Sequence, residues 1–300
     1  MNPSAGGIRG ALVHAAQVAA RATLPFVGGG DAMAVDAAAV AALRTELERV
    51  PVDGRVVVGE GEKDEAPMLF VGERFGSGGP SVDLAVDPID GTRLAAEGAP
   101  GAMVVMALAP RGGLIDLGPA HYMQKLVVSG AHPNLRVDDE VAAVLAELAR
   151  GSDDDGPPLR VLVQERPRNA ALIEQLEAAS ATVERFRHGD IERSVRVLRG
   201  GADALLGTGG APEAVITAAL ARALGGTMSA RFAPQGAREA QRLAAAGGDP
   251  YVIRGAGDVC RADALVVIAS VTGVDLGAGL TLPPVGADGT VAVWTAGSIG

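Results

Sequence analysis

Short apolar runs of strand length alternate with helical segments along this 300-residue chain, and that alternation limits the fold classes open to it. Apolar residues at three- and four-residue spacing indicate helices, whereas compact Val, Leu, Ile and Ala runs bounded by Gly, Pro or Asp are typical of buried strands. We expect helices at about 8–22, 35–49, 170–180 and 212–224, and strands at about 55–58, 82–86, 102–108, 159–164, 202–206 and 264–270. This order predicts an α+β first half and an α/β second half.

The segment 152–158, Ser-Asp-Asp-Asp-Gly-Pro-Pro, is the clearest linker in the chain. It combines a run of charge with Gly and Pro, which favour turns over regular structure. We therefore predict a domain boundary at 152–158, between a first half at 1–151 and a second half at 159–300.

The charge and the cysteine content of the chain limit the compartments and the classes of binding partner that we expect for it. The chain has 26 Lys and Arg against 36 Asp and Glu, so its formal net charge is −10. That acidity, without a Lys/Arg run, argues against a nucleic-acid partner. The single cysteine, Cys260, excludes an internal disulfide and fits a reducing compartment. The longest uncharged stretches, such as 98–110 and 264–274, are shorter than the roughly 18–20 residues of a membrane span. We expect a cytoplasmic protein with no membrane partner.

Acidic residues follow the strand expected at 55–58. Glu60 and Glu62 lie two positions apart, so in extended backbone both carboxylates point the same way, and Asp64 and Glu65 extend the cluster. Carboxylates this close repel one another unless cations lie among them. The cluster taken alone fits either a cation site or a solvated acidic turn.

A second acidic pair follows the strand expected at 82–86, in the segment 87–92, Asp-Pro-Ile-Asp-Gly-Thr. A turn through Pro88 can bring Asp90 beside Asp87, and two carboxylates at one strand end suit Mg²⁺ or Mn²⁺. Thr92 is expected to open a helix, whose N-terminus would favour a phosphate. An Asx turn with a helix cap is the alternative. Together with the first cluster, this segment suggests a phosphatase site with more than one metal ion.

A glycine-rich segment at 207–210 precedes the helix expected at 212–224, and we expect it to form a turn. Such turns often bind phosphate, but this one is neither a Walker loop, since no Gly-Lys-Ser/Thr follows, nor a dinucleotide fingerprint, since Pro212 replaces the last glycine. Glu213, in the first helical turn, is either a surface acid favoured by the helix dipole or a further metal ligand.

Taken in order, these motifs resemble the class II fructose-1,6-bisphosphatase family, which belongs to the lithium-sensitive, metal-dependent phosphatases. The resemblance extends from about residue 8 to about 275. It implies a layered α-β-α-β-α fold with two sheets, two or more Mg²⁺ or Mn²⁺ ions per site, a small-molecule sugar bisphosphate as substrate, and a homodimer or homotetramer. The motifs are 59–69 (Gly-Glu-Gly-Glu-Lys-Asp-Glu-Ala-Pro-Met-Leu), 87–92, 122–126 (Tyr-Met-Gln-Lys-Leu) and 209–213 (Gly-Gly-Ala-Pro-Glu).

The resemblance also implies roles for individual positions, with metal ligands mainly in the first half and substrate-binding residues mainly in the second. Asp64 and Thr92 would position and activate the attacking water, and Glu62 joins them as a candidate catalytic residue. The implied metal ligands are Asp36, Glu60, Asp87, Asp90 and Glu213. The implied substrate-binding residues are Asp90, Gly91, Thr92, Tyr122, Arg166, Pro167, Arg168, His188, Gly189, Asp190 and Gly210.

Departures from the family pattern lie near the substrate. Ala32-Met33-Ala34 stands where the family usually has a Lys and polar neighbours, His188 where it has an acid, and Arg166 where it has a Lys. We expect hydrolysis of the 1-phosphate of fructose 1,6-bisphosphate, giving fructose 6-phosphate and phosphate. Because partners of sugar hydroxyls decide between close analogues, one alternative is a paralogue for a seven- or eight-carbon bisphosphate, such as sedoheptulose 1,7-bisphosphate or an octose bisphosphate of a specialised pathway. A further alternative is a catalytically silent phosphosugar-binding protein.

Overall fold

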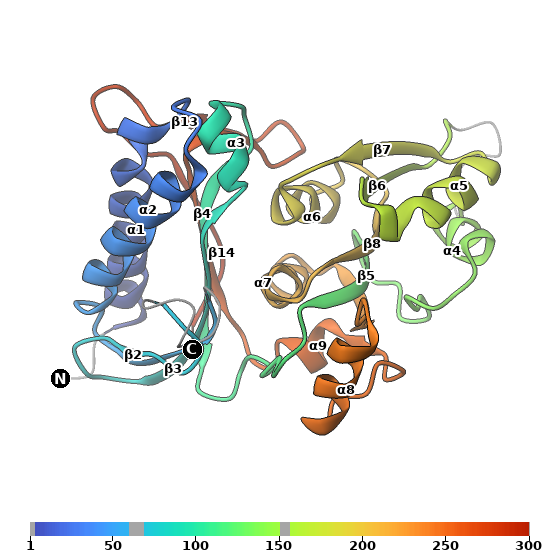
Figure 1. Cartoon of the computed structure of the whole chain (residues 1–300), viewed down its shortest axis with the longest axis horizontal. Coiled ribbons are helices and arrows are strands. Elements are labelled where there is room, and N and C mark those ends of the chain that lie inside the picture. The colour runs from blue at the N-terminus through green and yellow to red at the C-terminus, as the bar shows by residue number, and fades with distance from the viewer. Residues whose placement is uncertain (1–3, 60–68, 151–156, 300) are drawn as a thin grey trace.

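The computed structural model describes residues 4–59, 69–150 and 157–299. Five layers follow one another: helices, a six-stranded sheet, helices, a second six-stranded sheet, and helices (Figure 1). This arrangement confirms the layered α-β-α-β-α fold with two sheets. Within the described ranges, no helix is long and apolar enough to cross a membrane.

The first sheet carries α1 (Ala5–Ala22) and α2 (Ala32–Leu47) on its outer face (Figure 1). Its strand order is β14-β11-β4-β3-β1-β2. The central strands β3 and β4 have helices on both sides, which explains why they read as nearly continuous apolar runs rather than alternating ones. The strands are β1 (Asp53–Val58), β2 (Arg74–Phe75), β3 (Ser81–Asp90), β4 (Met103–Pro110), β11 (Leu265–Ser270) and β14 (Val293–Gly297).

The second sheet has the order β10-β9-β5-β8-β6-β7, and α4 (Val141–Leu148) and α5 (Ala170–Ala178) cover its outer face (Figure 1). Parallel pairing joins β6 to both β7 and β8, and the pairing of β5 with β8 and β9 is antiparallel. The strands are β5 (Tyr122–Val128), β6 (Arg160–Gln164), β7 (Thr182–Phe186), β8 (Ala204–Gly210), β9 (Thr227–Phe232) and β10 (Arg254–Gly255).

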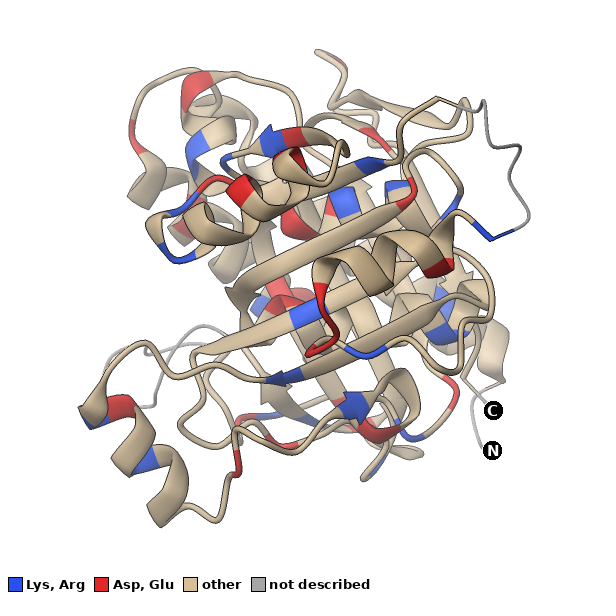
Figure 2. Ribbon diagram, turned by 90° about the vertical axis from the view of Figure 1, so that its right-hand side faces the viewer, with Lys and Arg blue, Asp and Glu red and all other residues tan. Residues whose placement is uncertain are grey.

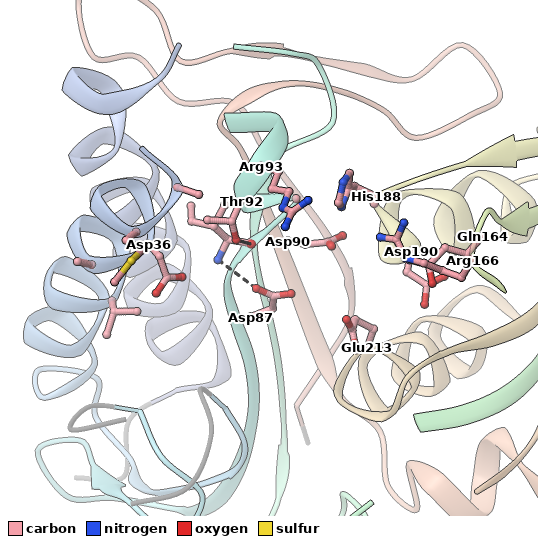
Figure 3. Close-up of a pocket in the computed structure, with 17 residues that line it drawn as sticks. Asp36, Asp87, Asp90, Thr92, Arg93, Gln164, Arg166, His188, Asp190 and Glu213 are labelled. Carbon is pink, nitrogen blue, oxygen red and sulfur yellow. Dashed lines mark hydrogen bonds between the residues drawn. The ribbon is translucent and has the colours of Figure 1, made fainter. Parts of the chain in front are cut away.

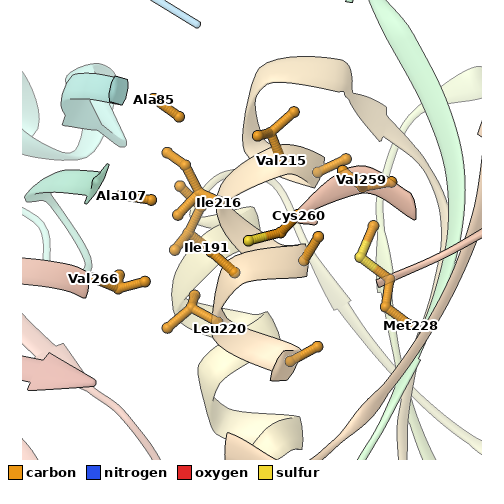
Figure 4. Packing of buried hydrophobic residues seen from close by; sticks show 14 of the residues in the cluster. Ala85, Ala107, Ile191, Val215, Ile216, Leu220, Met228, Val259, Cys260 and Val266 are labelled. Carbon is orange, nitrogen blue, oxygen red and sulfur yellow. The ribbon is translucent and has the colours of Figure 1, made fainter. Parts of the chain in front are cut away.

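The central layer contains α6 (Asp190–Leu198) and α7 (Ala211–Leu224), which lie between the two sheets. Residues 214–221 of α7 are all buried, which covers every side of the helix over two turns and explains its nearly continuous apolar sequence there. Figure 4 shows Ile216 and Leu220 facing the first sheet, with Met228 of the second sheet on the other side. Cys260 is buried in the same cluster.

Short elements complete the chain. Few of the described charged side chains are buried, and most lie on the outer helices, in loops or near strand ends (Figure 2). The remaining elements are α3 (Thr92–Glu97), α8 (Ala237–Ala245), α9 (Ala256–Val259), the 3-10 helices Leu24–Phe26 and Pro167–Asn169, and the hairpin of β12 (Thr272–Asp275) and β13 (Thr281–Pro284).

Chain order does not separate the two sheets at 152–158. β5 precedes that segment yet lies in the second sheet, while β11 and β14 follow it and lie in the first. The reason is that long-range pairing, which leaves no local sequence pattern, decides sheet membership. Residues 151–156 of the predicted linker lie outside the described part of the chain.

The expected glycine turn at 207–210 is wrong. These residues are the end of β8 and pair with residues 122–125 of β5. The run of glycines suggested a turn because glycine favours turns. In the structure these glycines lie in a strand, where the absence of a side chain leaves room for buried side chains next to them.

Candidate active site

A cavity of about 900 Å³ opens between the two halves of the layered structure. It is bounded by the start of α2, the end of β3, the start of α3, the segments after β6 and before α6, and the start of α7 (Figure 3). The residues predicted for the site that line it are Asp36, Asp87, Asp90, Gly91, Thr92, Arg166, His188, Gly189, Asp190 and Glu213.

The end of β3 presents Asp87 and Asp90 to the cavity (Figure 3). Pairing of β3 with β4 is irregular between these two residues, as in a β-bulge, and a bulge re-aims side chains at a strand end. The Ile89 amide donates a hydrogen bond to Asp87 Oδ1 over 3.1 Å, and Thr92 Oγ1 donates to the Ile89 carbonyl over 3.0 Å. The predicted convergence of Asp87 and Asp90 on one site is therefore observed, within a strand end rather than a free turn.

Glu213 reaches the same cavity from the first turn of α7, and Gly210 makes room for it. A Cβ atom placed on Gly210 would lie 1.9 Å from Glu213 Oε2, closer than real Cβ contacts allow. Gly210 has φ −64° and ψ 142°, which other residues also adopt, so the glycine is required by space and not by backbone conformation. This explains the Gly-Gly-Ala-Pro-Glu sequence, in which a glycine precedes a buried acid by three positions.

Two acids of this wall, Asp90 and Glu213, each have a carboxylate oxygen that the described part of the protein leaves unpaired. Asp90 Oδ2 and Glu213 Oε2 are buried and have no hydrogen-bond partner within the described structure. Burial, followed by the negative charge of Glu213, raises the pKa of Asp90 well above its usual value. Burial also raises the pKa of Glu213 and of Asp36. Such oxygen atoms suit a hard divalent cation, so the residues present fit the implied metal.

Within the described ranges, no three Asp, Glu, His or Cys side chains already lie close enough together to hold an ion. The predicted ligand Glu60 and the predicted catalytic residues Glu62 and Asp64 lie in 60–68, outside the described residues. The four described ligands thus share one cavity, whereas the fifth is not placed.

Part of the cavity wall is basic. Arg93, Arg166 and His188 line it from three different segments, and Figure 3 shows Arg93 and His188 on the same side of the cavity. Burial, and then the positive charges of Arg166 and Arg93, lower the pKa of His188 below its usual 6.5. The positive charges of Arg93 and Arg166 provide a favourable place for an anion.

Known proteins resemble this chain over most of its length. The family described as bacterial fructose-1,6-bisphosphatase, glpX-encoded, matches residues 8–293. The chain belongs to the class II fructose-1,6-bisphosphatase family. It is 37% identical over 276 residues to fructose-1,6-bisphosphatase 1 class 2 of Escherichia coli strain K12, a match that covers 86% of this chain and 81% of that protein. The class 2 enzyme of Shigella flexneri gives the same values. A crystal structure of the extragenic suppressor protein suhB from Bartonella henselae is 19% identical, with a TM-score of 0.39 over 68% of this chain and 76% of that one.

Four predicted substrate-binding residues do not line the phosphatase cavity: Tyr122, Pro167, Arg168 and Gly210. The Arg168 guanidinium lies over the Tyr122 ring, 4.7 Å from its centroid, and donates to the Thr208 carbonyl and to Gln164 Oε1, each over 2.9 Å. Because Gln164 does line the cavity, Arg168 supports the wall from behind.

Sequence reasoning missed two polar residues that line the cavity, Arg93 and Gln164. Arg93 directly follows Thr92, so a basic residue in the first turn of the expected helix was the available signal. Gln164 ends the strand expected at 159–164, and its position at a strand end was the only hint.

Proposed function

We propose that this phosphatase hydrolyses the 1-phosphate of fructose 1,6-bisphosphate with the help of two or more Mg²⁺ or Mn²⁺ ions. One observation carries the proposal: a single cavity holds the four described acids predicted as metal ligands together with arginine and histidine, and these acids include the buried oxygens Asp90 Oδ2 and Glu213 Oε2, which have no hydrogen-bond partner within the described structure. A bisphosphate needs both, because one phosphate must meet metal ions and the other a basic subsite.

Asp36, Asp87, Asp90 and Glu213, with Glu60, would hold the metal ions. Bound divalent ions would neutralise charge on the scissile phosphate and lower the pKa of a water molecule. Water then attacks phosphorus, the bond between phosphorus and the C1 oxygen breaks, and the sugar alkoxide takes up a proton.

The chain's own residues would orient this reaction. Thr92 Oγ1 gives its proton to the Ile89 carbonyl, so its lone pairs remain free to accept a hydrogen bond from the attacking water. Asp64 and Glu62 would assist it. Arg93, Arg166 and His188 would bind the 6-phosphate, and this remote binding fixes the substrate relative to the attacking water.

The resemblance also supports a homodimer or homotetramer in the cytoplasm. The test of the function is phosphate release from a panel of sugar mono- and bisphosphates with six, seven and eight carbons, with Mn²⁺ and separately with Mg²⁺. We expect the highest kcat/KM for fructose 1,6-bisphosphate, loss of activity on chelation, and loss in Asp90→Asn. A higher kcat/KM for a longer bisphosphate would show that fructose 1,6-bisphosphate is not the preferred substrate. If the folded protein released no phosphate from any of these compounds, the proposed phosphatase activity would be wrong.

A further inference from the structure

A buried ion pair lies directly behind the substrate side of the cavity. Lys125 on β5 is 1% exposed, and its ammonium group pairs with Oδ2 of Asp190, the first residue of α6. Asp190 lines the cavity, whereas Lys125 does not. Lys125 can therefore reach the substrate only through residues that line the cavity, and Asp190 is the one with which it pairs. Its positive charge also acts on Glu213, where it opposes the rise in the pKa of that carboxyl group.

The surroundings hold this pair in one arrangement. A Cβ atom on Gly209 would lie 2.6 Å from Asp190 Oδ2 and 3.3 Å from Lys125 Nζ, so only glycine fits beside the pair. The space around it, which Gln164 and Phe186 help to line, has no room for a water molecule. A buried ammonium group without water depends on its carboxylate partner, and the carboxylate depends equally on the ammonium.

The pair occupies one oxygen of Asp190 and leaves the other for the cavity. Oδ2 binds Lys125, while Oδ1 has no hydrogen-bond partner among the described residues. An ionised carboxylate oxygen binds hydrogen-bond donors or cations, and the donors that a sugar bisphosphate offers are its hydroxyl groups. The substrate phosphates, which carry negative charge, are excluded from that position.

We propose that Lys125 is a positioning residue for recognition of the sugar. By binding Asp190 Oδ2 it fixes Asp190 Oδ1 toward the cavity, where that oxygen accepts a hydrogen bond from a sugar hydroxyl of the substrate. The inference rests on the proposed function, since it concerns the sugar of that substrate. In this role Lys125 affects binding of the sugar, whereas a residue that only stabilised the fold would affect all substrates equally.

The experiment compares a substrate that carries sugar hydroxyls with one that carries none. Fructose 1,6-bisphosphate offers sugar hydroxyls, whereas p-nitrophenyl phosphate offers a phosphate ester without them. The proteins are wild type, Lys125→Met, Asp190→Asn and the double variant. Asp83→Asn serves as control, because Asp83 is another buried acid paired with arginine, on β3 and away from the cavity.

We expect Lys125→Met and Asp190→Asn each to lower kcat/KM for fructose 1,6-bisphosphate about 10- to 100-fold, mainly through KM, the range of one charged hydrogen bond. Hydrolysis of p-nitrophenyl phosphate should change less than about 3-fold. The double variant should lose no more than Asp190→Asn alone, because residues that act through one contact are not additive. In Asp83→Asn the ratio of the two activities should stay at the wild-type value.

Equal loss on both substrates, or losses that multiply in the double variant, would overturn the inference. If Lys125→Met does not fold, the double variant can replace it, because removing both charges leaves no unpaired charge in the interior. Its kcat/KM is then compared with that of Asp190→Asn to decide whether Lys125 acts through Asp190. Wild-type protein that hydrolyses p-nitrophenyl phosphate but not fructose 1,6-bisphosphate would instead reject the proposed substrate. The same variants would then be compared on the sugar phosphate that it does hydrolyse.

Discussion

Replacing Gly210 by Ala tests whether the position of one carboxylate controls the chemistry. The new Cβ would lie 1.9 Å from Glu213 Oε2, and real Cβ contacts essentially never fall below 3.0 Å, so the carboxylate must move by about 1.1 Å. A displacement of about 1 Å in an active site can lower the rate about 100-fold. We therefore expect kcat/KM for fructose 1,6-bisphosphate to fall about 100-fold, with weaker Mn²⁺ binding.

Stability should change little in this variant. Alanine adopts the Gly210 backbone conformation without strain, and the atom that must move is the end of a side chain, so we expect the free energy of unfolding to stay within about 1 kcal/mol of wild type. Phosphate release, Mn²⁺ titration by calorimetry and urea unfolding measure the three quantities.

Gly255→Ala provides a matched control. Gly255 also caps a helix and precedes an acid by three positions, but its Cβ would lie 3.7 Å from Asp258 Oδ2, an ordinary contact. We expect wild-type activity in this variant. A folded Gly210→Ala protein with wild-type kcat/KM would refute the argument that Gly210 exists to make room for Glu213.

Three further predictions concern pH, metal and core. The pKa of His188 is lower in the folded protein than in the unfolded chain, so protonation of His188 favours unfolding. The free energy of unfolding should therefore decrease as the pH falls below 6.5. A ¹H–¹⁵N NMR titration, assigned with His188→Asn, should give a midpoint below 6.5 that rises when phosphate binds, and a midpoint at or above 6.5 in free protein would contradict this. Mn²⁺ at 100 times its Kd should stabilise the folded protein by about 2.7 kcal/mol, seen as a higher Tm, and Asp90→Asn should lose most of that gain; an equal gain in the variant would remove Asp90 from the ligand set. Leu220→Ala, in the fully buried face of α7, should cost about 2–5 kcal/mol in urea unfolding, whereas Met33→Ala, 83% exposed, should cost less than about 0.5 kcal/mol; similar costs would refute the assigned packing.

The sequence predicted the helices and strands that have strong local patterns. The strand expected at 82–86 lies within β3, the strand expected at 102–108 begins one residue before β4, and the helix expected at 212–224 lies within α7. These elements are buried on several sides, so their apolar runs are long and clear. The motif at 87–92 likewise indicated where a pair of carboxylates would meet, because Asp87 and Asp90 are brought together by the end of one strand.

Other site features could not be predicted because they depend on pairing across the chain. In the sequence, Lys125 is one residue of the motif at 122–126, yet its partner Asp190 belongs to a helix of another layer. The basic wall arises only where α3 meets the segments beside β6 and α6. The glycines at 209 and 210 suggest a turn until the buried side chains beside them are known.

The sequence by itself determined the local elements, the acidic strand ends and, through its motifs, the family. Only the tertiary structure decided which strands share a sheet, which acids share one cavity with basic side chains, and which glycines make room for buried charge. The physical reason is the separation along the chain over which each interaction acts. Periodicity and turn chemistry act between near neighbours, whereas β11 joins β4, and Glu213 joins Asp90, only because folding buries α7 between two sheets.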